Sequence, residues 1–175
     1  CSYCLPESYD GRLKRWFGID RDSPLETLGE RDYTLTKVGF KYHLSDFNAS
    51  LGLANLTDFP QRLRRRQEIG RRFREELEGV KGVELLRFPP DRTHSYYVFS
   101  MKVERRDSFV LTMKERGIPT SVVNRRIDRH PVFGGVREDL VGMNEFDRLH
   151  VAVPSHDGLR EKDVTKIINA VKEGW

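Results

Sequence analysis

The sequence predicts an α+β fold in which long helices are followed by a small, mostly antiparallel sheet with helices packed on it. Apolar residues recur at helical spacing between 58 and 77, which predicts a long helix with one dry face. Apolar and polar residues alternate over 97–103 and again over 149–153, as in half-buried strands. Strand candidates follow one another directly, which favours an α+β layer over a doubly wound parallel sheet.

The first half of the chain reads as helices joined by a loop. Residues 6–17 predict a short helix that Gly18 ends, and 18–36 is loop-like. Ser45 or Asp46 is placed to cap the next helix. Asp58 then caps the long helix, with Pro60 in its first turn, where a missing N–H is tolerated. The dry face of that helix is expected to carry these residues: Leu63, Gly70, Phe73 and Leu77.

Short strands and two more helices are expected in the second half. Strands are predicted at 83–86, 97–103, 118–123 and 149–153. Asp107 is expected to cap a helix that runs to Arg116 and stops at Gly117. The polar stretch 124–147 lacks clear periodicity and is predicted to be a long loop, which at this length is usually functional or mobile. Four apolar residues at regular spacing predict a final helix: Val164, Ile167, Ile168 and Val171.

Composition restricts the classes of function. The 175 residues carry a net charge of +4, and no apolar run approaches the length of a membrane span or forms a signal peptide, so a cytoplasmic location is expected. The first residue is Cys1 rather than Met, which predicts a truncated or processed chain. Cys1 and Cys4 form one Cys-x-x-Cys pair without a second pair at matching spacing, so no metal site is expected.

One segment is crowded with arginines, which lie between Arg62 and Arg74. Such a stripe is one feature of a module that binds nucleic acid or another polyanion, and this remains the alternative function. Glutamates interleave with the arginines and can pair with them at i,i+3 or i,i+4 spacing, while no aromatic platform accompanies them. The favoured interpretation is therefore a solvated helix face.

The most informative stretch is 39–52, GFKYHLSDFNASLG, in which a glycine and a polar, aromatic patch lead into a helix rich in small residues. Lys41 and His43 precede the helix, and cationic side chains and helix-start N–H groups both favour phosphate. Small residues also allow a helix to approach its neighbour closely.

This stretch resembles the glycine-aromatic-Lys/Asn-Tyr-x-Met/Leu-x-Asp segment of pyridoxal phosphate (PLP)-dependent sugar aminotransferases of the DegT/StrS type. Further segments resemble the same family in the same order: RWFGIDR at 15–21, the arginines at 64–66, HSYY at 94–97, GIPTS at 117–121, RRIDRHPVF at 125–133, VAVPSH at 151–156 and the closing helix.

The resemblance implies the C-terminal portion of a fold type I PLP enzyme that works as a homodimer. Such enzymes transfer an amino group from an amino acid, typically glutamate, to a keto-sugar nucleotide. Residues 1–58 would be the C-terminal edge of the large PLP-binding domain with a subunit-interface segment, and 59–175 the small domain. The lysine that holds the cofactor covalently is expected upstream of Cys1, so no catalytic residue is assigned here.

The resemblance also implies binding residues. The family places a contact to the cofactor phosphate at Lys41 and His43, reaching into the partner subunit's site, although many members carry Asn and Arg at these positions. Four residues fall where the family approaches its sugar substrate: Asn124, Arg126, Asp128 and His130. Their side chains can hydrogen-bond hydroxyls or a diphosphate; the alternative is an ordinary charged loop.

Overall fold

The computed structural model describes residues 11–20, 35–123 and 125–175. The chain divides into two units, Cys1–Thr57 and Asp58–Trp175, each described here by itself. Among the described residues, no helix is long and apolar enough to cross a membrane.

The first unit contains a short helix and a backbone bridge. Helix α1 spans Gly11–Lys14, so the described part of the helix expected at 6–17 ends earlier than predicted; residues 6–10 lie outside the described part. Trp16 leaves the helix because its backbone pairs with Lys41 in an antiparallel bridge. Gly18 then turns the chain with a φ of +80°, a conformation that glycine adopts without strain.

Helix α2 (Asp46–Leu56) follows the bridge, and its predicted start is confirmed. The Ser45 hydroxyl accepts a hydrogen bond from the Asn48 backbone N–H at 3.3 Å, which satisfies one of the free donors at the helix start. Within the first unit no residue of this helix is buried.

The second unit begins with helix α3 (Phe59–Leu77). The predicted dry face is confirmed at Gly70, Phe73 and Leu77, which are buried together with Ile69, whereas Leu63 is half-buried. Asp58 holds the N-cap position with Pro60 in the first turn, but its side chain makes no capping hydrogen bond, contrary to the expectation.

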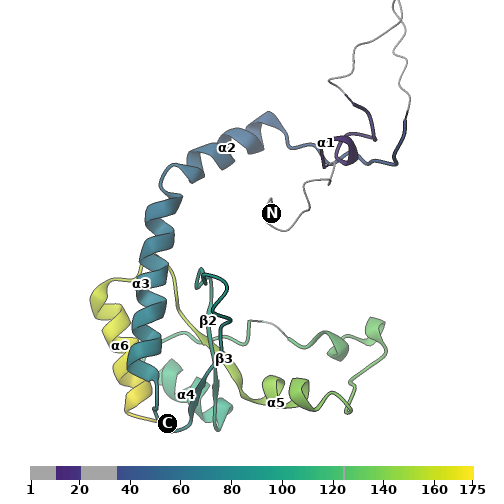
Figure 1. Ribbon diagram of the computed structural model, residues 1–175. Helices are drawn as coiled ribbons and strands as arrows, with labels where there is room; N and C mark the ends of the chain where they lie inside the picture. The colour runs from purple at the N-terminus through teal and green to yellow at the C-terminus, as the bar shows by residue number, and fades with distance from the viewer. Residues whose placement is uncertain (1–10, 21–34, 124) are drawn as a thin grey trace, which may run out of the picture. The chain divides into compact units, whose positions relative to one another are not determined.

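Three antiparallel strands form the sheet, in the order β1-β2-β3, which confirms the predicted α+β class (Figure 1). Strand β1 is Val83–Leu85, β2 is Phe99–Val103 and β3 is His150–Val153. The central strand β2 pairs on both sides, with Met101 opposite Leu85 on β1 and Val151 on β3.

One face of the sheet packs on the core and the other on helix α5 (Val141–Leu149). Phe99, Met101 and Val103 point into the core, beside helices α3, α4 (Arg106–Glu115) and α6 (Glu161–Lys172). The intervening residues Ser100 and Lys102 point to the opposite face, since successive side chains alternate across a strand. Helices α3 and α6 lie side by side (Figure 1).

Three further local predictions were wrong. The expected loop 124–147 holds two single-turn 3-10 helices, Ile127–Arg129 (η1) and Pro131–Phe133 (η2), and most of α5. The expected strand 118–123 is reduced to a bridge between Ser121 and Ala152. Arg105, with a left-handed φ of 48°, is the N-cap of α4, and Asp107 lies in the first turn instead.

Candidate functional site

In the first unit, the backbone around Lys41 is held by hydrogen bonds to the segment after α1. The Phe17 N–H donates to the Phe40 carbonyl at 3.1 Å, and the Tyr42 N–H donates to the Arg15 carbonyl at 2.9 Å. Gly39 is needed here, because a Cβ at that position would lie 2.1 Å from the Gly18 nitrogen. The close approach of the two segments therefore fixes the positions of Lys41 and His43, both of which are exposed within this unit.

His43, but not Lys41, lines a hollow of about 290 Å³. Its ring meets the Trp16 ring edge to face at a centroid distance of 4.7 Å. Arg12 and Arg15 contribute cationic groups to the lining, and Asp20 and Asp46, the latter in the first turn of α2, contribute carboxylates. Two guanidinium groups beside a helix N-terminus provide an environment that favours an anion such as a phosphate.

In the second unit, Arg126 and Asp128 bind each other inside the segment between Ser121 and α5. The Arg126 Nε donates to Asp128 Oδ1 at 2.6 Å, and a second guanidinium nitrogen donates to Oδ2 at 2.5 Å. The remaining donors of Arg126 reach the Asn144 side-chain oxygen and, at 3.2 Å, the Arg137 carbonyl. The Arg137 N–H in turn donates to Asp128 Oδ2 at 3.0 Å.

We call these four residues, Arg126, Asp128, Arg137 and Asn144, the knot. The two charged side chains at its centre are buried, Arg126 with 4% and Asp128 with 12% of the side chain exposed. The hydrogen bonds from Arg126, followed by the one from the Arg137 backbone, hold the pKa of Asp128 far below its usual range. The knot therefore remains ionised at any ordinary pH and closes the base of the 129–136 loop.

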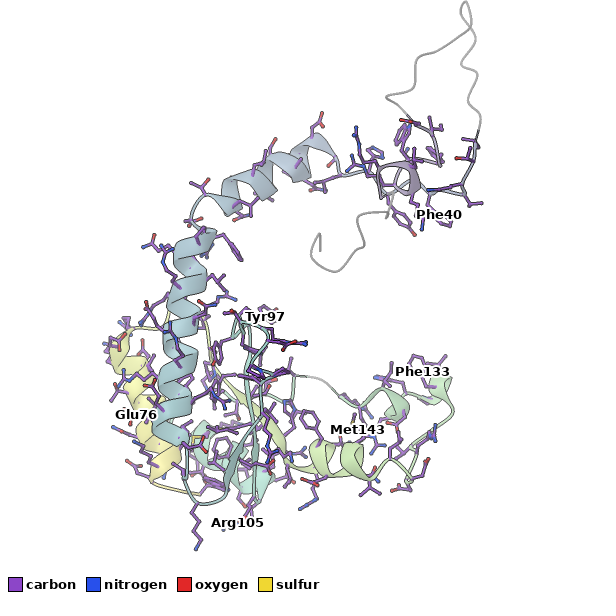
Figure 2. The ribbon with its side chains drawn as sticks, viewed as in Figure 1. Phe40, Glu76, Tyr97, Arg105, Phe133 and Met143 are labelled. Carbon is purple, nitrogen blue, oxygen red and sulfur yellow. The ribbon has the colours of Figure 1, made fainter. Side chains whose placement is uncertain are left out.

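The other two expected substrate residues are placed differently. His130 is exposed at the junction of η1 and η2 and does not belong to the knot. Asn124 lies outside the described residues. Figure 2 shows Phe133 at the outer end of this segment, far from the sheet. The structure thus brings Arg126 and Asp128 together and leaves His130 accessible.

Asn144 and Arg137 were missed by the sequence analysis. Asn144 lies 18 residues from Arg126 and on helix α5, which was expected to be loop. A signal was present in Phe146 and Leu149, which are spaced at i and i+3 and both half-buried. This pattern is short, and Gly142, earlier in α5, lowers the helical propensity.

The sequence predicts that the arginines of α3 pair with glutamates of the same helix. In the structure they pair mainly with residues of other elements. Arg62 and Arg66 both bind Asp157, in the segment after β3, at 2.7 and 3.0 Å. Arg65 and Arg72 bind Glu161 of α6. Hydrogen bonds from Arg62 and Arg66 lower the pKa of Asp157 well below its usual range. Much of the positive charge of the helix is therefore used to hold α3 against α6 and its preceding segment.

No group of three or more His, Cys, Asp or Glu residues that could hold a metal ion occurs in the described part of the chain. Cys1 and Cys4 lie outside it. His150 is buried in β3, where its Nε2 lies 3.0 Å from the Ser100 hydroxyl.

Comparisons with known proteins identify relatives over nearly the whole chain. The chain is 33% identical to the sugar aminotransferase CalS13 of Micromonospora echinospora, with a TM-score of 0.81 over 94% of this chain and 44% of that one. It is 36% identical to AtS13 of Actinomadura melliaura, with a TM-score of 0.81 over 93% of this chain and 43% of that one.

A curated relative from Saccharopolyspora spinosa, a dTDP-4-dehydro-2,3,6-trideoxy-D-glucose 4-aminotransferase, is 28% identical over 78% of this chain and 36% of its own length. The chain thus spans less than half of the length of each of these proteins. Residues 12–172 match the model of the DegT/DnrJ/EryC1/StrS aminotransferase family. The chain belongs to this family, whose enzymes depend on PLP.

Proposed function

We propose that this chain is the C-terminal part of a PLP-dependent enzyme that transfers an amino group from an amino acid, glutamate, to a keto-sugar nucleotide. The observation that carries the proposal is the family match over residues 12–172. A relative that acts on a dTDP-linked dehydro sugar, and a structural neighbour at 33% identity that is a sugar aminotransferase, support the substrate class.

The two units correspond, in this proposal, to parts of two domains. Residues 1–58 are the C-terminal edge of the large PLP-binding domain and a subunit-interface segment, and 59–175 are the small domain. The division between Thr57 and Asp58 supports this boundary. The coverage of 43–44% of the structural neighbours supports a catalytic lysine that lies outside these 175 residues.

Lys41 and His43 are proposed to contact the phosphate of the cofactor. PLP supplies an electron sink at which an amino group is exchanged. The residues present fit a phosphate, because His43 lines a hollow with Arg12 and Arg15 and the N-terminus of α2 begins beside it. Lys41 adds a point charge from a backbone position that the bridge to Trp16 fixes.

Helix α2 is proposed to pack against the partner subunit of a homodimer. Among the residues of the first unit that the structure describes, none covers its large apolar side chains, and between 56% and 79% of each is exposed: Phe47, Leu51, Leu53 and Leu56. These side chains are distributed around the helix, and a helix that exposes this much apolar surface is typical of one that is buried against another protein surface.

For the sugar substrate, we propose two different roles for the four expected residues. His130, and Asn124 beside Arg125, contact the substrate directly. Arg126 and Asp128 hold the segment in place, since their charged groups are already bound within the knot.

The phosphate assignment is tested in the full-length enzyme with Lys41→Gln. Loss of one charged contact to phosphate is expected to raise the Kd for PLP about tenfold or more, measured by equilibrium titration of the cofactor. The control is Lys81→Gln, which removes the same charge from an exposed site in the other unit.

Borohydride reduction in the presence of PLP tests the position of the covalent lysine. A stoichiometric reduced adduct on Lys41 would overturn the assignment of this residue as a phosphate contact. An unchanged Kd in Lys41→Gln would do the same.

A further inference from the structure

A second hollow, separate from the one at His43, lies in the Asp58–Trp175 unit and is lined mainly by arginines. It has a volume of about 660 Å³, which falls within the range of roughly 300 to 1,000 Å³ that is typical of small-molecule sites. The start of α4, the segment around η1 and helix α5 each contribute to its wall. Its arginines are Arg106, Arg125, Arg126, Arg129 and Arg148, against two carboxylates, Glu138 and Asp147.

Three of these arginines are engaged in holding the wall together. Arg126 is bound in the knot. Arg129 pairs with the Asp147 carboxylate, and Arg106 donates to the Asp147 backbone carbonyl. Asp147 lies on α5, so these contacts join the start of α4, the η1 turn and α5 around the hollow.

The other two arginines that line the hollow are Arg125 and Arg148. Both are exposed, and neither forms an ion pair or hydrogen bond with any of the residues that the structure describes. Two guanidinium groups without a directly bonded carboxylate therefore line a hollow whose other arginines are fixed, and the charge of Arg148 acts only at longer range on Glu145. A wall that is already held in place loses little conformational freedom when a ligand binds.

We propose that this hollow binds the diphosphate group of a small molecule, with Arg125 and Arg148 as its principal ligands. A guanidinium presents a planar fork of N–H donors that matches phosphate oxygens in pairs, and two such forks suit two linked phosphoryl groups. The hollow is a single concave site, and much of the charge of α3 is neutralised by Asp157 and Glu161, so a small anion fits better than a polymer.

The identification of this diphosphate with that of a sugar-nucleotide substrate rests on the proposed function. The binding of a diphosphate at this hollow does not depend on the proposed function, so binding and the identity of the ligand are tested separately.

Calorimetric titration of the 175-residue chain with inorganic pyrophosphate, at an ionic strength of about 0.15 M where long-range attraction is screened, tests the site itself. Pyrophosphate is expected to bind more tightly than orthophosphate. The double variant Arg125→Gln/Arg148→Gln is expected to weaken pyrophosphate binding at least about tenfold. The matched control is Arg64→Gln/Arg71→Gln, which removes two exposed arginines of α3 outside the hollow.

Equal losses in the two double variants would show a general effect of net charge and overturn the proposal. Absence of pyrophosphate binding to the unaltered chain would overturn it as well. Circular dichroism melting of each variant establishes that it is folded, and because all four side chains are exposed we expect unchanged midpoints.

Steady-state kinetics of the full-length enzyme test the source of the diphosphate. If it belongs to the substrate, the hollow variant raises KM for the sugar nucleotide and leaves KM for glutamate unchanged. If pyrophosphate binds but KM for the sugar nucleotide does not change, the site is confirmed and its link to the substrate is overturned. An enzyme without aminotransferase activity would refute the proposed function and leave the titration result standing.

Discussion

His150 is a buried histidine, and only one of its two ring nitrogens has a hydrogen-bond partner. Its Nε2 lies 3.0 Å from the Ser100 hydroxyl, and its ring stacks on Phe146 at a centroid distance of 4.5 Å. Its Nδ1 is buried and has no hydrogen-bond partner. Burial, and then the positive charge of Arg106, lower the pKa of this imidazole in the folded protein.

This arrangement predicts a loss of stability in mild acid. Because the pKa of His150 is lower in the folded than in the unfolded chain, the unfolded chain binds more protons, so stability is complete above about pH 6.5 and falls as the pH decreases through that value. His150→Gln removes this titration and is expected to flatten the dependence of the free energy of unfolding on pH between 8 and 5.5, measured by urea denaturation.

The control for this experiment is His156→Gln, at an exposed position after β3. In this variant the free energy of unfolding should depend on pH as steeply as in the unaltered protein. Part of the slope survives in His150→Gln, because burial and Arg74 also lower the pKa of His94. Identical slopes in His150→Gln and the unaltered protein would contradict the interpretation.

At the scale of elements, helix α3 depends on a glycine at its contact with the segment before β2. The Tyr96 ring lies directly over Gly70, and a Cβ there would be 2.2 Å from the ring. Tyr96 cannot easily withdraw, because its N–H donates to His94 Nδ1 at 2.9 Å and its carbonyl accepts from the Ser155 hydroxyl at 3.1 Å.

Gly70→Ala is therefore expected to destabilise the protein by about 1–3 kcal/mol through overpacking, although alanine is the better helix former. The matched control is Gly142→Ala in α5, where an added Cβ meets no atom within 4 Å. That variant should be neutral or slightly stabilised. Urea midpoints measure both, and a Gly70→Ala protein as stable as Gly142→Ala would refute the contact.

How well each element could be predicted depended on whether it buries a complete face. Helix α6 and strand β2 were predicted because Val164, Ile168, Met101 and Val103 all enter the core with a regular period. Helix α5 buries none of its residues completely, and it contacts the sheet through the ion pair of Lys102 with Glu145 at 2.9 Å and the stacking of Phe146 on His150. A helix of nine residues that contains a glycine gives only a short sequence pattern, which is difficult to distinguish from a loop.

The candidate site was also only partly predictable from the sequence. Arg126 and Asp128 were singled out by type and position, but their mutual binding could not be predicted from sequence, because Arg129 is closer to the Asp128 carboxylate along the chain. Burial, which decides the partner, depends on α5 and its Asn144. The role of Lys41 stays a prediction from family resemblance, supported by the bridge to Trp16.

At the scale of the whole molecule, the apolar side chains of α2 predict that the full-length protein dimerises through this helix. Phe47 is 79% exposed within its unit. Phe47→Glu is expected to shift the dimer toward monomer in sedimentation velocity, because a charge would be buried at the interface. Phe133→Glu, at an exposed position on η2, is the control and should leave the dimer intact. A Phe47→Glu protein that remains dimeric would remove α2 from the interface.

The knot has a consequence for how this part of the chain can change in evolution. It fastens the base of the 129–136 loop, so that the tip with Val132, Phe133 and the two left-handed glycines Gly134 and Gly135 bears no part of the core. Replacements or insertions at the tip cost little in folding free energy, since loop closure depends only weakly on length. Evolution can therefore vary this tip while the scaffold beneath it stays the same.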